Sequence, residues 1–272
     1  MKDSPELHTR LVDNSTVHYF PTKRSPRWVV RHGFEGVFWR ILPANGLRGL
    51  ARRGFARWIF PRFSRGVIES AHELGGYEFL YLGVPDGKRT ELKMKFEGDS
   101  VLIEKYAVEV AAEKYLKNEA ATLERLQAAN SANFPWLISH GYGSLKLRGR
   151  LPKRGFDPRK RKDRYNLIKA LTSMYSILGI QTNAEGCCKV IGHGDLNKWN
   201  MFIDMADDVH IFDFENATLQ LLGYDLVTAY RMELTKARLH DALKEGLLAF
   251  SKHPSFQFLD VQRQFEMLLR TE

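Results

Sequence analysis

The sequence predicts an α+β fold, with strands in the first half of the chain and mostly helices in the second. Runs with strand-like alternation cover residues 77–82, 91–96 and 101–106, and turn residues separate them. A long helical pattern follows at 110–129, and helical patterns also fill most of the last fifty residues. Runs of strands followed by runs of helices are typical of α+β proteins.

The N-terminal region is set apart by its charge. Residues 1–25 are polar and contain proline, which predicts a loose arm. Residues 21–66 hold eleven Lys and Arg and one acid. A short basic amphipathic helix is expected at 47–60, with apolar residues on one side and four arginines largely on the other. Such a helix suits a membrane interface, or packing against the rest of the chain with its arginines outward.

The elements after the long helix begin with a strand expected at 134–140. A basic loop is expected at 151–164, because residues 151–165 hold seven Lys and Arg and two acids. Helical spacing then predicts four helices, at 166–179, 225–237, 240–251 and 259–269.

Length and composition restrict the class of protein. A chain of 272 residues with 44% hydrophobic and 27% charged residues is long enough for a large core or two lobes. No apolar run approaches the roughly eighteen residues that span a bilayer, and the N-terminus lacks the apolar core of a secretory signal. Cys187 and Cys188 are adjacent, a spacing unsuited to an ordinary disulfide or to metal binding. We therefore expect a cytoplasmic protein with reduced thiols.

The most informative motif is His193-Gly194-Asp195 with Asn200, followed by Asp213. Short apolar runs before, between and after these residues predict buried strands, at 190–191, 201–203 and 209–212. Two hairpin strands would then hold the three polar groups at adjacent ends, around one point. A polar loop between buried strands is the simpler alternative, but four residues in this pattern recur by chance in about one such chain in a thousand.

This pattern matches the chemistry of phosphoryl transfer from Mg·ATP. One carboxylate must accept or orient the proton of the attacking hydroxyl group, which suits Asp195. An asparagine and a later aspartate must hold the divalent ions that bridge the phosphates, which suits Asn200 and Asp213. We therefore expect ATP and Mg²⁺ as cofactors.

The order of elements, this motif and the run Gly223-Tyr224-Asp225-Leu226 resemble the bilobal protein-kinase-like fold, closest to its aminoglycoside phosphotransferase and choline kinase branch. The resemblance covers roughly residues 75–245. It implies a small N-lobe with an antiparallel sheet at 71–145 and a mostly helical C-lobe at 146–272, after a basic N-terminal extension at 1–70. It also implies that His193 braces the catalytic loop and that Asp225 anchors it.

Kinases of this fold carry a lysine on the third strand, which contacts the α and β phosphates, and a glutamate on the next helix, which holds that lysine. Lys105 and Glu119 stand at the corresponding places. Two solvated surface charges are the alternative, and other candidates for the two roles are Lys93, Lys95, Glu109 and Glu113. The loop at 83–88 lacks the strict glycine-rich pattern, so its phosphate contacts are left open. Glu215 is a further candidate for a metal or substrate contact.

The departures from protein kinases point to a small acceptor. Gly194 replaces the arginine that reads a phosphorylated activation loop, and only eleven residues separate Asp213 from Asp225. We expect a hydroxyl group of a small molecule or glycan as the acceptor. The basic residues at 153–164 would repel a cationic aminoglycoside and favour an anionic acceptor. Lipopolysaccharide core kinases share the fold, which implies a cytoplasmic site of action and a peripheral contact of 47–60 with the inner face of the membrane.

Two other classes of function remain as alternatives. A pseudokinase or scaffold on an anionic surface would keep the fold without turnover, although none of the expected site residues is missing. Nucleic-acid binding through the arginine-rich and aromatic N-terminal region is the least favoured, because nothing in the chain resembles a defined nucleic-acid module.

Overall fold

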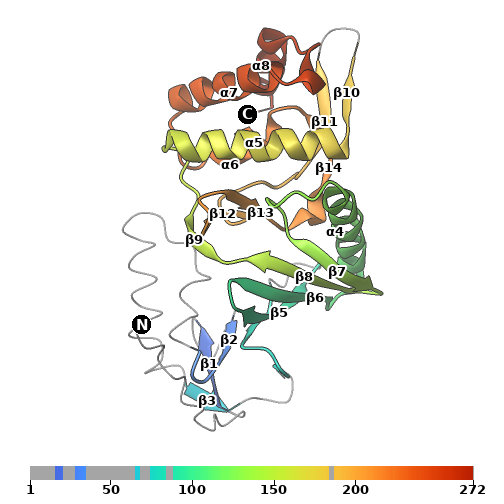
Figure 1. The fold of residues 1–272 in the computed structure, drawn as a ribbon, viewed down its shortest axis with the longest axis vertical. Coiled ribbons are helices and arrows are strands. Elements are labelled where there is room, and N and C mark those ends of the chain that lie inside the picture. Colours follow the sequence, from blue (N-terminus) through green and yellow to red (C-terminus); the bar gives the residue numbers. More distant parts are fainter. Residues whose placement is uncertain are drawn as a thin grey trace, which may run out of the picture.

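The computed structural model has an antiparallel sheet at one end and a mostly helical part at the other (Figure 1). It describes residues 16–20, 28–34, 65–67, 74–83, 88–183 and 187–271. The helix predicted at 47–60 and most of the 83–88 loop lie outside these residues. Within them, no helix is both long and apolar enough to cross a membrane.

The larger sheet has eight strands within the described residues, in the order β3-β1-β2-β4-β5-β6-β8-β7, and every neighbouring pair is antiparallel. Its strands include the three predicted between residues 77 and 106. The bounds are β1 Thr16–Phe20, β2 Trp28–Arg31, β3 Arg65–Val67, β4 Phe79–Tyr81, β5 Thr90–Glu97, β6 Ser100–Ala107, β7 Trp136–Gly141 and β8 Ser144–Arg150.

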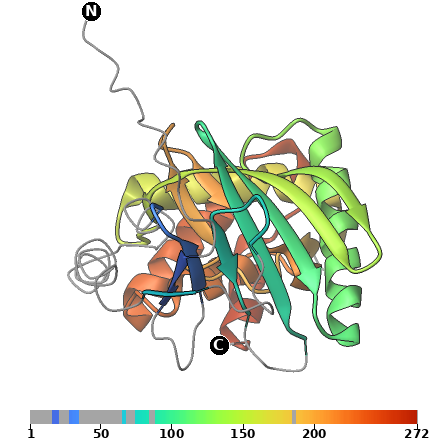
Figure 2. The same ribbon diagram turned by 90° about the horizontal axis from the view of Figure 1, so that it is seen from below.

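Helix α4, Val110–Ala128, lies along one side of this sheet, and Figure 2 shows the sheet in front of the C-terminal helices. Its apolar side, with Leu116, Leu123 and Leu126, is buried at the junction of the two parts. The segment is rich in strong helix formers, and packing of this apolar face holds α4 in place.

The C-terminal part contains helices α5 Arg161–Leu178, α6 Tyr224–Tyr230, α7 Lys236–Ser251 and α8 Val261–Leu269, with single 3-10 turns η3 at Phe214–Asn216 and η4 at Pro254–Phe256. Two small antiparallel sheets join them. One contains β10 Ile180–Thr182, β11 Cys188–Gly192 and β14 Thr218–Leu221, and the other contains β9 Pro152–Gly155, β12 Met201–Asp204 and β13 Val209–Ile211.

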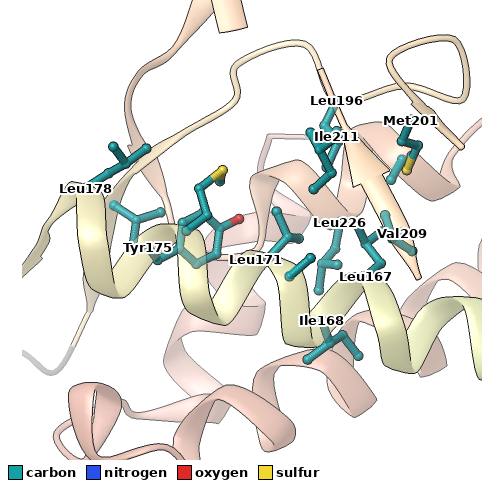
Figure 3. Close-up of a cluster of buried hydrophobic side chains, with 14 of the residues drawn as sticks. Leu167, Ile168, Leu171, Tyr175, Leu178, Leu196, Met201, Val209, Ile211 and Leu226 are labelled. Atoms are coloured by element: carbon teal, nitrogen blue, oxygen red, sulfur yellow. The ribbon is translucent and has the colours of Figure 1, made fainter. Parts of the chain in front are cut away.

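Helix α5 is the centre of the main hydrophobic core. Figure 3 shows its residues Leu167, Leu171 and Tyr175 packed with Leu226 of α6 and with Val209 of β13. Leu196, within the loop between β11 and β12, and Met201, at the beginning of β12, belong to the same cluster and are almost fully buried. The core therefore fixes the middle and the end of this loop.

Three sequence predictions about elements are wrong. Residues 16–20 of the predicted loose arm form β1, because Val17 and Tyr19 alternate into a small core with β2 and β4 residues. The predicted basic loop at 151–164 is instead β9 followed by the first turn of α5. The helix predicted at 225–237 ends at Tyr230. Strands β1, β2 and β3, which precede residue 70, belong to the same sheet as the strands that follow it. The division of the chain at residue 70 remains a prediction.

Candidate active site

The loop between β11 and β12 is held by buried His193. Its Nε2 lies 2.8 Å from the carbonyl oxygen of Phe212, and its Nδ1 lies 3.3 Å from the backbone nitrogen of Asp195. A carbonyl oxygen can only accept, so Nε2 carries the proton and Nδ1 accepts. His193 therefore ties the loop to the end of β13, next to Asp213.

Asp225, at the start of α6, holds the backbone of the same loop. Its carboxylate accepts hydrogen bonds from the backbone nitrogens of His193 at 3.0 Å and Gly194 at 3.3 Å, and from the hydroxyl of Tyr175 at 2.9 Å. Gly194 has φ +84°, and a Cβ atom there would lie 2.1 Å from the carbonyl oxygen of Asn216. Only glycine fits this approach without a shift of the backbone.

Asp195 and Asn200 lie on this loop, and a hydrogen bond connects them. The amide nitrogen of Asn200 donates to the backbone oxygen of Asp195 at 2.8 Å, and the backbone oxygen of Asn200 accepts from Phe212 at 3.1 Å. The Asp195 carboxylate is exposed and accepts from the Asn197 side chain at 3.1 Å. Asp195 is thus open to an incoming hydroxyl group, while Asn200 is held beside the residue that precedes Asp213.

Lys105 on β6 connects the sheet to this site. Its Nζ lies 2.9 and 2.7 Å from the two carboxylate oxygens of Glu119 on α4, and 2.6 Å from Oδ1 of Asp213. Burial lowers the pKa of Lys105, but the negative charges of Asp213 and Glu119 outweigh this effect and raise the pKa well above its ordinary range. Burial raises the pKa of Asp213, but the Lys105 charge lowers it below its ordinary value. Lys105 is therefore a permanent cation at the junction of the two parts.

The other candidates for the lysine and glutamate roles lie elsewhere. Lys105 pairs with Leu92 across the β5–β6 ladder, so Lys93 and Lys95 point to the opposite face of the sheet. Glu109 accepts from the backbone nitrogen of Arg89 at 3.0 Å. Within the described residues, Glu119 is the predicted glutamate that reaches Lys105.

Glu215 follows Asp213 closely and lies beside α4. The side-chain nitrogen of Asn118 donates to the backbone oxygens of Glu215 and Ala217, at 3.0 Å each. Burial, and then the negative charge of Asp213, raise the pKa of the Glu215 carboxyl group to about 7. The contact of Asn118 could not be predicted from the sequence, because a single asparagine on a helix has no spacing signal.

The loop between β11 and β12 also carries Lys198 and Trp199, which are only spacer positions in the sequence motif. Lys198 forms an ion pair with Glu233 at 2.6 Å and lies over the ring of Trp199, 5.4 Å from its centre. Trp199 is 49% exposed, and the Asn197 side chain accepts from its backbone nitrogen at 2.8 Å. The exposed indole of Trp199, one residue before Asn200, is a candidate for contact with a bound substrate.

The cations of the predicted basic loop are largely paired with acids. Arg154 forms two hydrogen bonds, of 2.5 and 2.6 Å, with the buried carboxylate of Asp163. Arg164 binds Glu245 at 2.9 Å. Part of the positive charge of this segment is therefore used in ion pairs that stabilise the fold. A count of residues in the sequence does not reveal these pairs.

The donor atoms at the site fit a magnesium ion. Mg²⁺ takes oxygen ligands and keeps several for phosphates and water, and Asn200 and Asp213 offer an amide oxygen and a carboxylate. The Asn200 amide nitrogen is used by the Asp195 carbonyl, which leaves the amide oxygen available for a metal. In the part of the chain that the structure describes, no group of three or more His, Cys, Asp or Glu side chains forms a separate metal centre.

Comparisons with known proteins place the chain among phosphate-transferring enzymes. A family model described as "Phosphotransferase enzyme family" matches residues 94–259. No curated protein sequence matches. Among solved structures, the chain is similar to the macrolide 2'-phosphotransferase MphH from Brachybacterium faecium, with 12% identity over 72% of this chain and 84% of that chain and a TM-score of 0.49. It is also similar to the choline kinase LicA from Streptococcus pneumoniae, with 12% identity over 70% of this chain and 90% of that chain and a TM-score of 0.38.

Proposed function

The chain belongs to the phosphotransferase enzyme family, and we propose that it transfers the γ-phosphoryl group of Mg·ATP to a hydroxyl group of a sugar or alcohol. The matched residues 94–259 include Lys105, Asp195 and Asp213. The α+β architecture with an antiparallel N-terminal sheet and a helical C-terminal part is the one predicted.

One observation carries the proposal. Lys105 from the sheet, Glu119 from α4 and Asp213 from the end of the β12–β13 hairpin meet within hydrogen-bonding distance of one ammonium group. Asp213 is 108 residues from Lys105 in the sequence, and the three residues come from both parts of the molecule. A cation and a carboxylate suit a metal-bound polyphosphate, and Asn200 is tied by its backbone oxygen to Phe212, the residue before Asp213.

In the proposed reaction, bound Mg·ATP supplies the phosphoryl group and the charge of the metal. Asp195 orients the acceptor hydroxyl group and accepts its proton as the new oxygen–phosphorus bond forms and the bond to ADP breaks. Asn200 and Asp213 would hold the metal, and Lys105, positioned by Glu119, would neutralise charge on the α and β phosphates. His193 and Asp225 keep the loop in place through the hydrogen bonds described above.

We further propose that the acceptor is an anionic glycan, such as a lipid-linked glycan of the lipopolysaccharide core type. The net charge of +9 and the arginine-rich segment at 21–66 support an anionic acceptor. Action at the inner face of a membrane and the contact of 47–60 with it are part of the same proposal.

A phosphate-transfer screen tests the proposal. The purified protein is incubated with Mg·ATP and with sugars, choline-like alcohols, aminoglycosides or lipopolysaccharide core fragments, and transfer is followed by radiolabel and mass spectrometry. We expect transfer to one of the anionic glycans, and loss of turnover by about a thousandfold in Asp195→Ala with its nucleotide binding intact. Full turnover in Asp195→Ala would rule out the role of Asp195. Nucleotide binding without any turnover in the wild-type protein would support the pseudokinase alternative instead.

A further inference from the structure

A hollow lies between the beginning of α5 and the first turns of α7. Its lining combines three arginines and two acids with two apolar residues: Arg159, Arg164, Arg238, Asp241, Glu245, Leu234 and Ala242. None of these side chains was assigned to nucleotide or metal binding above. The hollow is therefore a separate place where charged side chains converge.

The three arginines differ in how they are held. Arg164 binds Glu245 at 2.9 Å, and Arg159 binds Asp157 at 2.9 Å. Arg238, on α7, is exposed and forms no ion pair with any residue that the structure describes. Arg238 thus presents a guanidinium group whose donors are available to a ligand, in a hollow that it shares with two ion-paired arginines.

An ion-pair chain links the hollow to the catalytic loop. Glu233 binds Lys198 at 2.6 Å and lies 3.9 Å from a guanidinium nitrogen of Arg159. Lys198 is three residues beyond Asp195 in the same loop. A molecule whose hydroxyl group lies at Asp195 could therefore extend past Lys198 and Glu233 into the hollow.

The charge around the hollow favours an anion. Residues 159–164 and 231–245 together carry five more basic than acidic residues. The planar fork of an arginine matches the oxygen atoms of a phosphate or carboxylate group, and such hydrogen bonds are stronger than neutral ones. Glu245 pairs with Arg164 and Glu233 pairs with Lys198. The lining of the hollow itself still has one more arginine than acids, since Arg159, Arg164 and Arg238 face only Asp241 and Glu245.

We propose that this hollow binds a phosphate or carboxylate group of the acceptor, with Arg238 as its main ligand and Arg159 and Arg164 beside it. The proposal rests on the proposed function, because it concerns the acceptor of that reaction. It deepens that function by assigning the anionic part of the acceptor to named residues at a stated place.

The test uses inorganic phosphate and glucuronate as probes of the two anion types. Binding is measured by calorimetry on the full chain, saturated with Mg²⁺ and a non-hydrolysable ATP analogue so that the nucleotide site is filled. We expect half-saturation by at least one probe below about 10 mM in the wild-type protein. Arg238→Ala should weaken that binding at least about fivefold, and Arg238→Lys should weaken it less. Arg270→Ala is the matched control, because Arg270 is an exposed arginine at the end of α8 that does not line the hollow.

Equal affinity of Arg238→Ala and wild type, or no binding of either probe to the wild type, overturns the inference. Binding to phosphatidylglycerol vesicles that Arg238→Ala abolishes, without binding of either soluble probe, also overturns it in favour of a lipid headgroup. Turnover on any acceptor is measured in parallel. Turnover that persists while Arg238→Ala has no effect on probe binding contradicts only the hollow. Anion binding at Arg238 without any turnover contradicts only the proposed function.

Discussion

Lys105 and Asp195 stand on two sides of the candidate site that are built in different ways. On the sheet side, Lys105 and Glu119 are buried and hydrogen-bonded to each other and, through Lys105, to Asp213. On the helical side, Asp195 and Trp199 are exposed on a loop whose backbone is fixed by buried neighbours. Substitutions of the buried side chains on the first side should therefore change stability together with activity, whereas substitutions of the exposed side chains on the second should change activity alone.

The largest effect on stability is expected for Lys105→Met. Glu119 is fully buried and would lose its only cation among the described residues. Removing one partner of a buried ion pair costs about 3–5 kcal/mol of unfolding free energy. Urea denaturation measures the loss. Lys95→Met is the control, because Lys95 lies on β5 and points to the opposite face of the sheet from Lys105. It should change stability by less than about 0.5 kcal/mol. Similar losses in the two variants would show that Lys105 is not a structural ion-pair partner.

Gly194→Ala tests how much the close backbone approach in the loop contributes to stability and turnover. The new Cβ atom would approach the carbonyl oxygen of Asn216 to 2.1 Å at a φ of +84°. We expect a loss of about 3 kcal/mol in unfolding free energy, together with reduced turnover, since clash and backbone strain add. Gly98→Ala has φ +62° but no atom within 4 Å of the new Cβ, so it should cost only about 1 kcal/mol. Equal costs at the two positions would contradict the close approach.

His210 on β13 predicts a pH dependence that is independent of catalysis. Burial, and then the charge of Arg150, lower the pKa of His210 to about 4. A depressed histidine pKa stabilises the fold above the unfolded pKa of about 6.5, and this contribution is lost as the pH falls toward 4. Between pH 7.5 and 5.0 the wild-type protein should lose about 2 kcal/mol more than His210→Leu in urea denaturation. Parallel losses in the two proteins would show that His210 does not titrate in this way.

The smallest change in stability is expected for Trp199→Ala. The ring is half exposed, so unfolding free energy should change by less than about 0.5 kcal/mol. If the indole contacts the acceptor, the KM for the acceptor should rise about tenfold while the KM for ATP stays constant, since an aromatic contact contributes about 1 kcal/mol or slightly more. Trp136→Ala, at a tryptophan of similar exposure on β7, is the control and should leave both values unchanged.

The same contrast explains what the sequence could predict. Asp195 and Asn200 lie just before the β12–β13 hairpin and Asp213 just after it, so local patterns were enough to group these residues. The pairing of Lys105 with Glu119 needed a resemblance to kinases, because the register that turns Lys93 and Lys95 away from the site forms only in the folded sheet. The N-terminal strand at 16–20 was missed because its few apolar residues are buried only when residues of β2 and β4 pack against them.

Charge was the least predictable property. A count of residues 151–165 suggested an open basic loop, whereas Asp163 and the distant Glu245 neutralise Arg154 and Arg164. Conversely, Arg238 looked like an ordinary helical residue, and its position at the hollow follows from the packing of α5 against α7. Ion pairs between residues far apart in the chain cannot be read from local composition.

The central claim is that Lys105, Asn200 and Asp213 meet on a magnesium-bound triphosphate. Calorimetric binding of a non-hydrolysable ATP analogue, with Mg²⁺ or with EDTA, tests it most directly in the wild-type protein and in Asp213→Asn. The account predicts that Mg²⁺ strengthens binding at least about tenfold in the wild type and has little effect in Asp213→Asn. Binding that is indifferent to Mg²⁺ in the wild type, or an unchanged magnesium effect in Asp213→Asn, would contradict it.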